Sequence, residues 1–136
     1  MLHGTRKLIA LFGLVLATAA YAAAPHFADL KFSDSEGGDA AESFTPDTPK
    51  IYLHAGLVDM PSGTKLTSNW IAEDSHGVAP PNYKIDSVDL TVGAIVNVAT
   101  FSLSKPTKGW PIGTYRVDLL IDGKASGEAH FKVEAE

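Results

Sequence analysis

The chain contains no cysteine, and this absence excludes several classes of protein. No disulfide can form, no cysteine can act as a nucleophile, and no lipid can be attached to a cysteine at a cleavage point. An antibody-like domain with a bridge between its sheets is excluded for the same reason. The protein must hold together by burying apolar side chains, and 45% of its residues are apolar.

Sequence signatures of catalysis and of cofactor binding are also missing. There is no Gly-x-Ser-x-Gly sequence, and Gly37-Gly38 does not precede a helical pattern that would bind phosphate. The side chains of the consecutive run Asp74-Ser75-His76 cannot converge as those of a catalytic triad do. Apart from the first residue, the only methionine is Met60, so no methionine-rich segment supports a copper(I) carrier. We therefore expect a protein that is not an enzyme and has no cofactor.

Positive charge is scarce in this chain. Eleven Lys and Arg residues stand against 16 Asp and Glu residues, which gives a formal net charge of −5. Nucleic acids and anionic lipid surfaces attract proteins that present a positive field. We therefore expect no nucleic-acid partner, and solubility is a sufficient explanation of the acidic balance.

A single long apolar run lies near the start of the chain. Residues 8–20 follow two basic residues and lead into Ala20-Tyr21-Ala22, the small-x-small pattern of a cleavage site. The run is shorter than the roughly 20 apolar residues of a membrane span. We predict a signal-peptide helix within residues 1–22 and a periplasmic or secreted protein that meets the membrane only during export. Extended through Ala24, the same run leaves an uncleaved anchor as an alternative.

Cleavage after residue 22 would leave 114 of the 136 residues, enough for one domain. Residues 23–43 begin with weak alternation over residues 26–32 and continue as a polar, acidic, glycine-bearing stretch. We interpret them as a first edge strand and a flexible acidic loop. The spacing of Asp34, Glu36 and Asp39 does not match a calcium-binding loop.

Residues 44–136 alternate between apolar and polar side chains in six segments separated by turns. These segments are residues 51–57, 64–73, 85–92, 95–104 and 115–121, and a closing strand with Ala129, Phe131 and Val133 inward. Asp122-Gly123 joins the last two, because this pair tolerates the positive φ angles of a tight hairpin. With the weak first strand, the pattern predicts an all-β, immunoglobulin-like antiparallel sandwich of about seven strands.

Two aromatic residues favour the immunoglobulin type of sandwich. Trp70 lies midway along the third strand, where such domains bury an aromatic side chain against the opposite sheet. Tyr115 follows Gly113 at the start of the sixth strand, where a buried hydroxyl can bond to backbone upstream.

The chain resembles uncharacterised immunoglobulin-like domains of secreted bacterial proteins over about residues 44–133. The residues that carry the likeness are Phe101-Ser102-Leu103-Ser104-Lys105-Pro106, Gly109-Trp110-Pro111-Ile112-Gly113-Thr114-Tyr115 and Asp122-Gly123, with Pro61-Ser62-Gly63-Thr64-Lys65-Leu66 and Trp70 before them. The resemblance implies the fold and a role in adhesion, spacing, carrier binding or assembly, and it supplies no catalytic residue.

Trp110 is the main candidate for a binding residue, with Lys108 and Pro111 beside it. It lies between Gly109 and a proline in a loop at one end of the sandwich, where recognition loops cluster. An exposed Trp110 would anchor an unidentified protein or cell-surface partner. The alternative, which the resemblance favours, is that its indole closes the open end of the core.

Two other functions remain open. A periplasmic copper or zinc protein would use His26, His54 or His130, although Pro25 lacks the amide that an amino-terminal copper site requires. A structural or assembly subunit would instead exchange its first strand, because a weak strand followed by a long loop can pair with another molecule.

Overall fold

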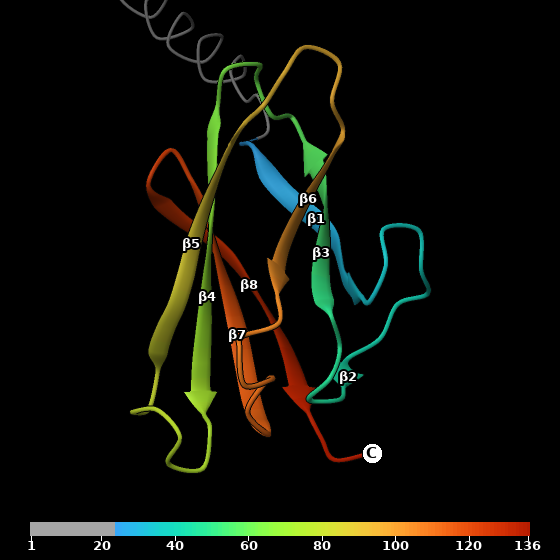
Figure 1. Ribbon diagram of the computed structural model, residues 1–136. Helices are drawn as coiled ribbons and strands as arrows, with labels where there is room; N and C mark the ends of the chain where they lie inside the picture. Colours follow the sequence, from blue (N-terminus) through green and yellow to red (C-terminus); the bar gives the residue numbers. More distant parts are fainter. Residues whose placement is uncertain (1–23) are drawn as a thin grey trace, which may run out of the picture.

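The computed structural model describes residues 24–136, and these form two packed β-sheets (Figure 1). The signal-peptide helix predicted within residues 1–22 lies outside the described residues. Residues 24–136 contain no helix, and so none that could cross a membrane.

Three strands form the first sheet and five the second. The first has the order β1 (His26–Ser33), β3 (Lys50–Val58) and β6 (Val98–Ser104). The second has the order β2 (Ser43–Phe44), β8 (Lys124–Val133), β7 (Gly113–Ile121), β4 (Lys65–Asp74) and β5 (Tyr83–Thr91). The predicted immunoglobulin-like sandwich is confirmed. One pairing differs from the prediction, because the two-residue β2 lies parallel to β8.

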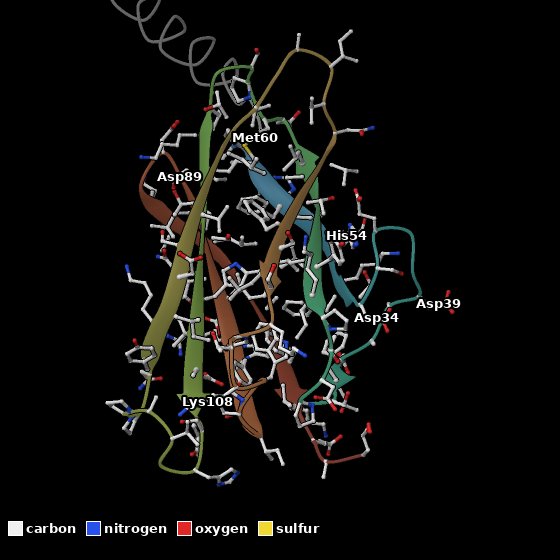
Figure 2. The ribbon with its side chains drawn as sticks, viewed as in Figure 1. Asp34, Asp39, His54, Met60, Asp89 and Lys108 are labelled. Atoms are coloured by element: carbon white, nitrogen blue, oxygen red, sulfur yellow. The ribbon has the colours of Figure 1, made fainter. Side chains whose placement is uncertain are left out.

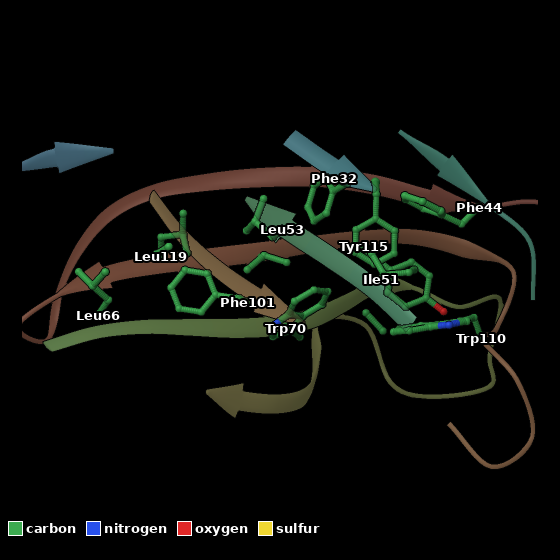
Figure 3. Packing of buried hydrophobic residues seen from close by; sticks show 14 of the residues in the cluster. Phe32, Phe44, Ile51, Leu53, Leu66, Trp70, Phe101, Trp110, Tyr115 and Leu119 are labelled. Carbon is green, nitrogen blue, oxygen red and sulfur yellow. The ribbon is translucent and has the colours of Figure 1, made fainter. Parts of the chain in front are cut away.

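The alternation seen in the sequence places one face of each main strand in the core. Ile51, Leu53 and Ala55 of β3 are fully buried, and so are Val117 and Leu119 of β7. Each such side chain contributes about 1.5–3 kcal/mol to folding when it leaves water, Ala less. The core between the sheets therefore replaces the missing disulfide (Figure 3).

Phe131 lies at the centre of an aromatic cluster that joins the two sheets. Its ring stacks on that of Tyr115, with centroids 4.8 Å apart and an interplanar angle of 6°. Four more rings meet it edge-on at 4.9–6.2 Å, those of Phe32, Phe44, Trp70 and Trp110. Trp70 is 1% exposed, which confirms its predicted burial against the opposite sheet.

The N-terminal strand β1 is part of this core. Phe32 and Ser33 are buried, and the amide of Ala41 donates to the Phe32 carbonyl oxygen at 2.9 Å. The pairing with β3 is interrupted between Ala28 and Lys31, where Asp29 has a φ of 52°. This irregularity is a β-bulge at the edge of the first sheet.

The connection between β5 and β6 differs from the prediction. The sequence predicts a strand from residue 95, but β6 begins at Val98. Ile95 has a φ of 60°, and a β-branched residue in this left-handed region cannot continue a strand. By contrast, the Asp122-Gly123 turn is confirmed, because its two residues have φ angles of 48° and 83°.

Gly113, the first residue of β7, lies so close to the backbone of Asp74 that no side chain fits there. Its φ is 155°, and a Cβ atom there would lie 1.9 Å from the Asp74 carbonyl oxygen. We expect Gly113→Ala to lower the free energy of unfolding by about 2–4 kcal/mol, since backbone must move to admit the methyl group. Urea unfolding followed by circular dichroism measures the change.

Gly123→Ala is the matched control. Gly123 also has a positive φ, 83°, but a Cβ atom added there would have no other atom within 4 Å. This substitution is expected to cost only about 1–2 kcal/mol. Equal losses for the two variants would contradict the steric explanation.

Candidate functional site

Trp110 is buried, so it is not an exposed binding anchor. Its side chain is 2% exposed, and the indole N–H donates to the Thr48 carbonyl oxygen at 2.8 Å. Its backbone amide donates to the Pro46 carbonyl oxygen at 3.0 Å. Burial of the apolar indole in the core is favourable, because its one polar atom keeps a hydrogen bond there. The alternative interpretation is confirmed: Trp110 closes one end of the core (Figure 3).

Tyr115 forms the expected bond to backbone upstream. Its ring is 1% exposed, and its hydroxyl donates to the Pro111 carbonyl oxygen. Burial raises the pKa of Tyr115 to about 12, because the phenolate would lose its hydration. Trp110 and Tyr115 therefore fix the loop that contains Lys108 and Pro111.

Lys108 and Pro111 line a cleft of about 400 Å³ at this end of the sandwich. One wall is the β6–β7 loop (residues 105–112), and the other is the β4–β5 loop (residues 75–82) with the start of β5. Apolar side chains and prolines form most of the lining: Val78, Ala79, Tyr83, Ile85, Pro106 and Pro111. Lys108 marks this end of the molecule in Figure 2. We call this feature the cleft.

Two side chains at the rim of the cleft are unusually exposed for apolar groups. Val78 is 71% exposed and Tyr83 is 50% exposed. Neither residue is among the site residues predicted from the sequence. The available signal was the large apolar side chain of Val78 in a loop otherwise made of polar residues, alanine, glycine and proline. Only the folded structure brings Val78 near Lys108, because the two loops are far apart in the sequence.

Within residues 24–136, the only charged residue that lines the cleft is Lys108, although the chain as a whole is acidic. The neighbouring segments, residues 75–85 and 105–113, also contain Lys84 and Lys105, and Asp74 and Asp86 flank the first of them. All three lysines are exposed, and none forms an ion pair with another residue of the range 24–136. The cleft thus combines an apolar lining with one exposed positive charge, that of Lys108.

Hydrogen bonds hold the β4–β5 wall in place. The buried Ser75 hydroxyl accepts from the Ala79 amide at 2.8 Å and lies 3.2 Å from the Ala79 carbonyl oxygen. The Asp74 carboxylate accepts from the backbone amide of His76 at 2.9 Å. These three consecutive polar residues thus support the loop. The cleft exists before any ligand binds.

The structure does not bring the three candidate metal ligands together. His54 contacts two hydroxyl groups, with Nε2 3.0 Å from Ser33 Oγ and Nδ1 3.1 Å from Thr100 Oγ1. His130 lies on the other sheet, and its Nε2 is 2.7 Å from a Glu128 carboxylate oxygen. His26 lies at the start of β1. Within residues 24–136 no group of three His, Asp or Glu side chains is arranged to hold a metal ion.

The fold and the cleft together define an immunoglobulin-like domain with a preformed hollow at one end. The fold is similar to that of an immunoglobulin-like protein (PA1606) from Pseudomonas aeruginosa, with a TM-score of 0.54 and 14% sequence identity. The similarity covers 82% of this chain and 98% of that one. At this identity the likeness concerns the fold alone.

Weaker likenesses connect the chain to two proteins of different function. One is the sensor domain of the anti-sigma factor RsgI4 in Pseudobacteroides cellulosolvens (TM-score 0.44, 12% identity, 79% of this chain and 95% of that one). The other is a superoxide reductase (neelaredoxin) from Ignicoccus hospitalis (TM-score 0.45, 15% identity, 79% and 82%). No family model and no curated protein matches the sequence.

Removing the Tyr115 hydroxyl tests the bond that fixes the cleft wall. We expect Tyr115→Phe to lower the free energy of unfolding by about 1–3 kcal/mol near neutral pH, because the Pro111 carbonyl oxygen loses its donor. The phenol ionises near pH 10 in the unfolded chain and near 12 in the folded one. Its contribution is therefore present below pH 10 and is lost as the pH rises toward 12.

The difference in unfolding free energy between wild type and Tyr115→Phe should accordingly shrink as the pH rises from 10 toward 12. Urea unfolding at several pH values measures it. A difference that is zero at pH 7, or that grows above pH 10, would show that this hydroxyl does not stabilise the loop.

Proposed function

We propose that the protein is an exported, non-enzymatic protein-binding module and that the cleft is its binding site. The observation that carries the proposal is the apolar cleft whose one charged lining residue is Lys108, in a chain with an excess of acidic residues. The partner is a segment of another protein in the periplasm or outside the cell. It places apolar side chains next to Asp or Glu.

The size and chemistry of the cleft support an apolar ligand. Its volume of about 400 Å³ is within the range of roughly 300–1,000 Å³ typical of ligand sites. An apolar group that enters it gains about 0.8 kcal/mol for each CH₂ removed from water. Covering Val78 and Tyr83 adds to this gain, because both are exposed in the free protein.

The polar groups at the cleft support binding over catalysis. The hydroxyls of Ser75 and Tyr115 are already hydrogen-bonded to backbone within the walls. Burial also raises the pKa of Tyr115, which makes that hydroxyl a poor base at neutral pH. Lys108 remains as an exposed charge at the rim. It is suited to steering and orienting an acidic segment.

A displayed library of random peptides tests this function. We expect the protein to enrich peptides that carry apolar residues beside Asp or Glu. In fluorescence polarisation, Val78→Asp should weaken the binding of an enriched peptide at least tenfold, because it places a carboxylate at the apolar rim. Val78 is 71% exposed, so the variant should fold normally.

Ile95→Asp is the matched control, since it makes the same chemical change at a fully exposed residue away from the cleft. It should change the affinity less than twofold. Lys108→Glu should weaken binding and reduce its dependence on salt concentration. No enrichment of any peptide, or equal losses at Val78 and Ile95, would contradict the proposal.

A further inference from the structure

A second exposed apolar feature lies on the β5–β6 connection. Ile95 is fully exposed, and Val96 and Val98 are 44% and 51% exposed. Ile95 also has a φ of 60°, an unfavourable conformation for a β-branched residue. We call these three residues the apolar tip. In an isolated molecule the tip faces water. Covering it with an apolar surface is therefore favourable.

The tip and the cleft lie at opposite ends of the same two strands. β5 begins with Tyr83 at the cleft and ends just before the tip, and β6 returns from Val98 toward the β6–β7 loop. Figure 1 shows the β5–β6 connection at the top of the molecule, and Figure 2 places Lys108 near the bottom. A strand of nine residues spans about 30 Å. The tip of one molecule therefore cannot reach its own cleft.

An acidic residue lies beside the tip, and a lysine lies at the rim of the cleft. The two loops nearest the tip, residues 59–63 and 93–97, contain one charged residue, Asp59, and the β7–β8 turn at the same end adds Asp122 and Lys124. Asp59 directly follows β3, and the pairing of Gly56 with Val98 places the end of β3 beside the tip. The charged residue that lines the cleft is Lys108. Apolar side chains beside an acidic residue are thus the same chemistry that we propose for the partner of the cleft.

We propose that the apolar tip of one copy inserts into the cleft of a second copy, so that the molecules associate head to tail. The proposal rests on the binding site described above and names a second copy of this chain as one of its partners. Because the two contacting surfaces differ, the contact repeats from molecule to molecule, and it closes only if the rotation between neighbours allows a ring. Two short loops form a small interface, so the association is weak and depends on concentration.

Sedimentation velocity of the protein purified after export tests the proposal over a range from micromolar to millimolar concentrations. The wild-type protein should form dimers and then larger species as the concentration rises. Ile95→Asp removes the tip but keeps the cleft, and Val78→Asp alters the cleft but keeps the tip. Each variant alone should remain monomeric in the range where wild type associates.

An equimolar mixture of the two variants is the decisive sample. It contains one intact tip and one intact cleft, so it should form 1:1 dimers and nothing larger. A wild-type protein that stays monomeric at millimolar concentration would overturn the proposal. So would association of either variant alone, or a mixture that fails to dimerise while wild type associates.

The peptide experiment separates this result from the proposed function. If Ile95→Asp binds enriched peptides but wild type does not self-associate, the cleft is a binding site for other proteins and the head-to-tail contact is wrong. If neither peptides nor a second copy bind, both proposals fail. Thermal unfolding of the two variants confirms that each is folded, which is expected because both substituted residues are exposed.

Discussion

The fold depends on the packing of aromatic rings around Phe131. In many immunoglobulin domains a disulfide links the two sheets, but this chain has no cysteine. Here Phe131 stacks on Tyr115 within one sheet and meets Phe32 from the other. Each such aromatic pair contributes about 0.5–1.5 kcal/mol beyond the burial of its area. The link between the sheets is therefore made of many weak contacts, each of which requires accurate positioning of its rings.

This packing also determines the shape of the candidate binding site. Trp110 extends from the β6–β7 loop into the aromatic cluster, and its indole hydrogen bond to the Thr48 carbonyl oxygen ties that loop to the chain before β3. A loop held in this way loses little conformational entropy when a ligand binds, so more of the contact energy remains as affinity. Burial of Trp110 in the core thus keeps the cleft residues Lys108 and Pro111 in place. Trp110 itself does not line the cleft.

The sequence predicted those features that depend on local pattern. Alternation in residues 51–57 and 115–121 identified β3 and β7, and the Asp122-Gly123 pair identified the last hairpin. The burial of Trp110 was not predictable with the same certainty, because an aromatic residue in a loop has the same pattern whether it points inward or outward. The loss of strand structure at Ile95 depends on a backbone angle that composition does not encode. The cleft was missed for a third reason: its walls come from loops about 30 residues apart, and only the sandwich brings them together.

The bulge in β1 also affects how the molecule meets others of its kind. A regular edge strand presents a row of unpaired amides and carbonyls. Strands of other molecules can pair with this row, which leads to aggregation and fibril formation. The left-handed residue Asp29 interrupts that row at one lateral margin of the first sheet. A protein without covalent bridges benefits from such protection, because every transient opening of its sheets exposes further backbone to neighbouring molecules. At this margin the bulge makes edge-to-edge pairing of β1 with a strand of another molecule unfavourable.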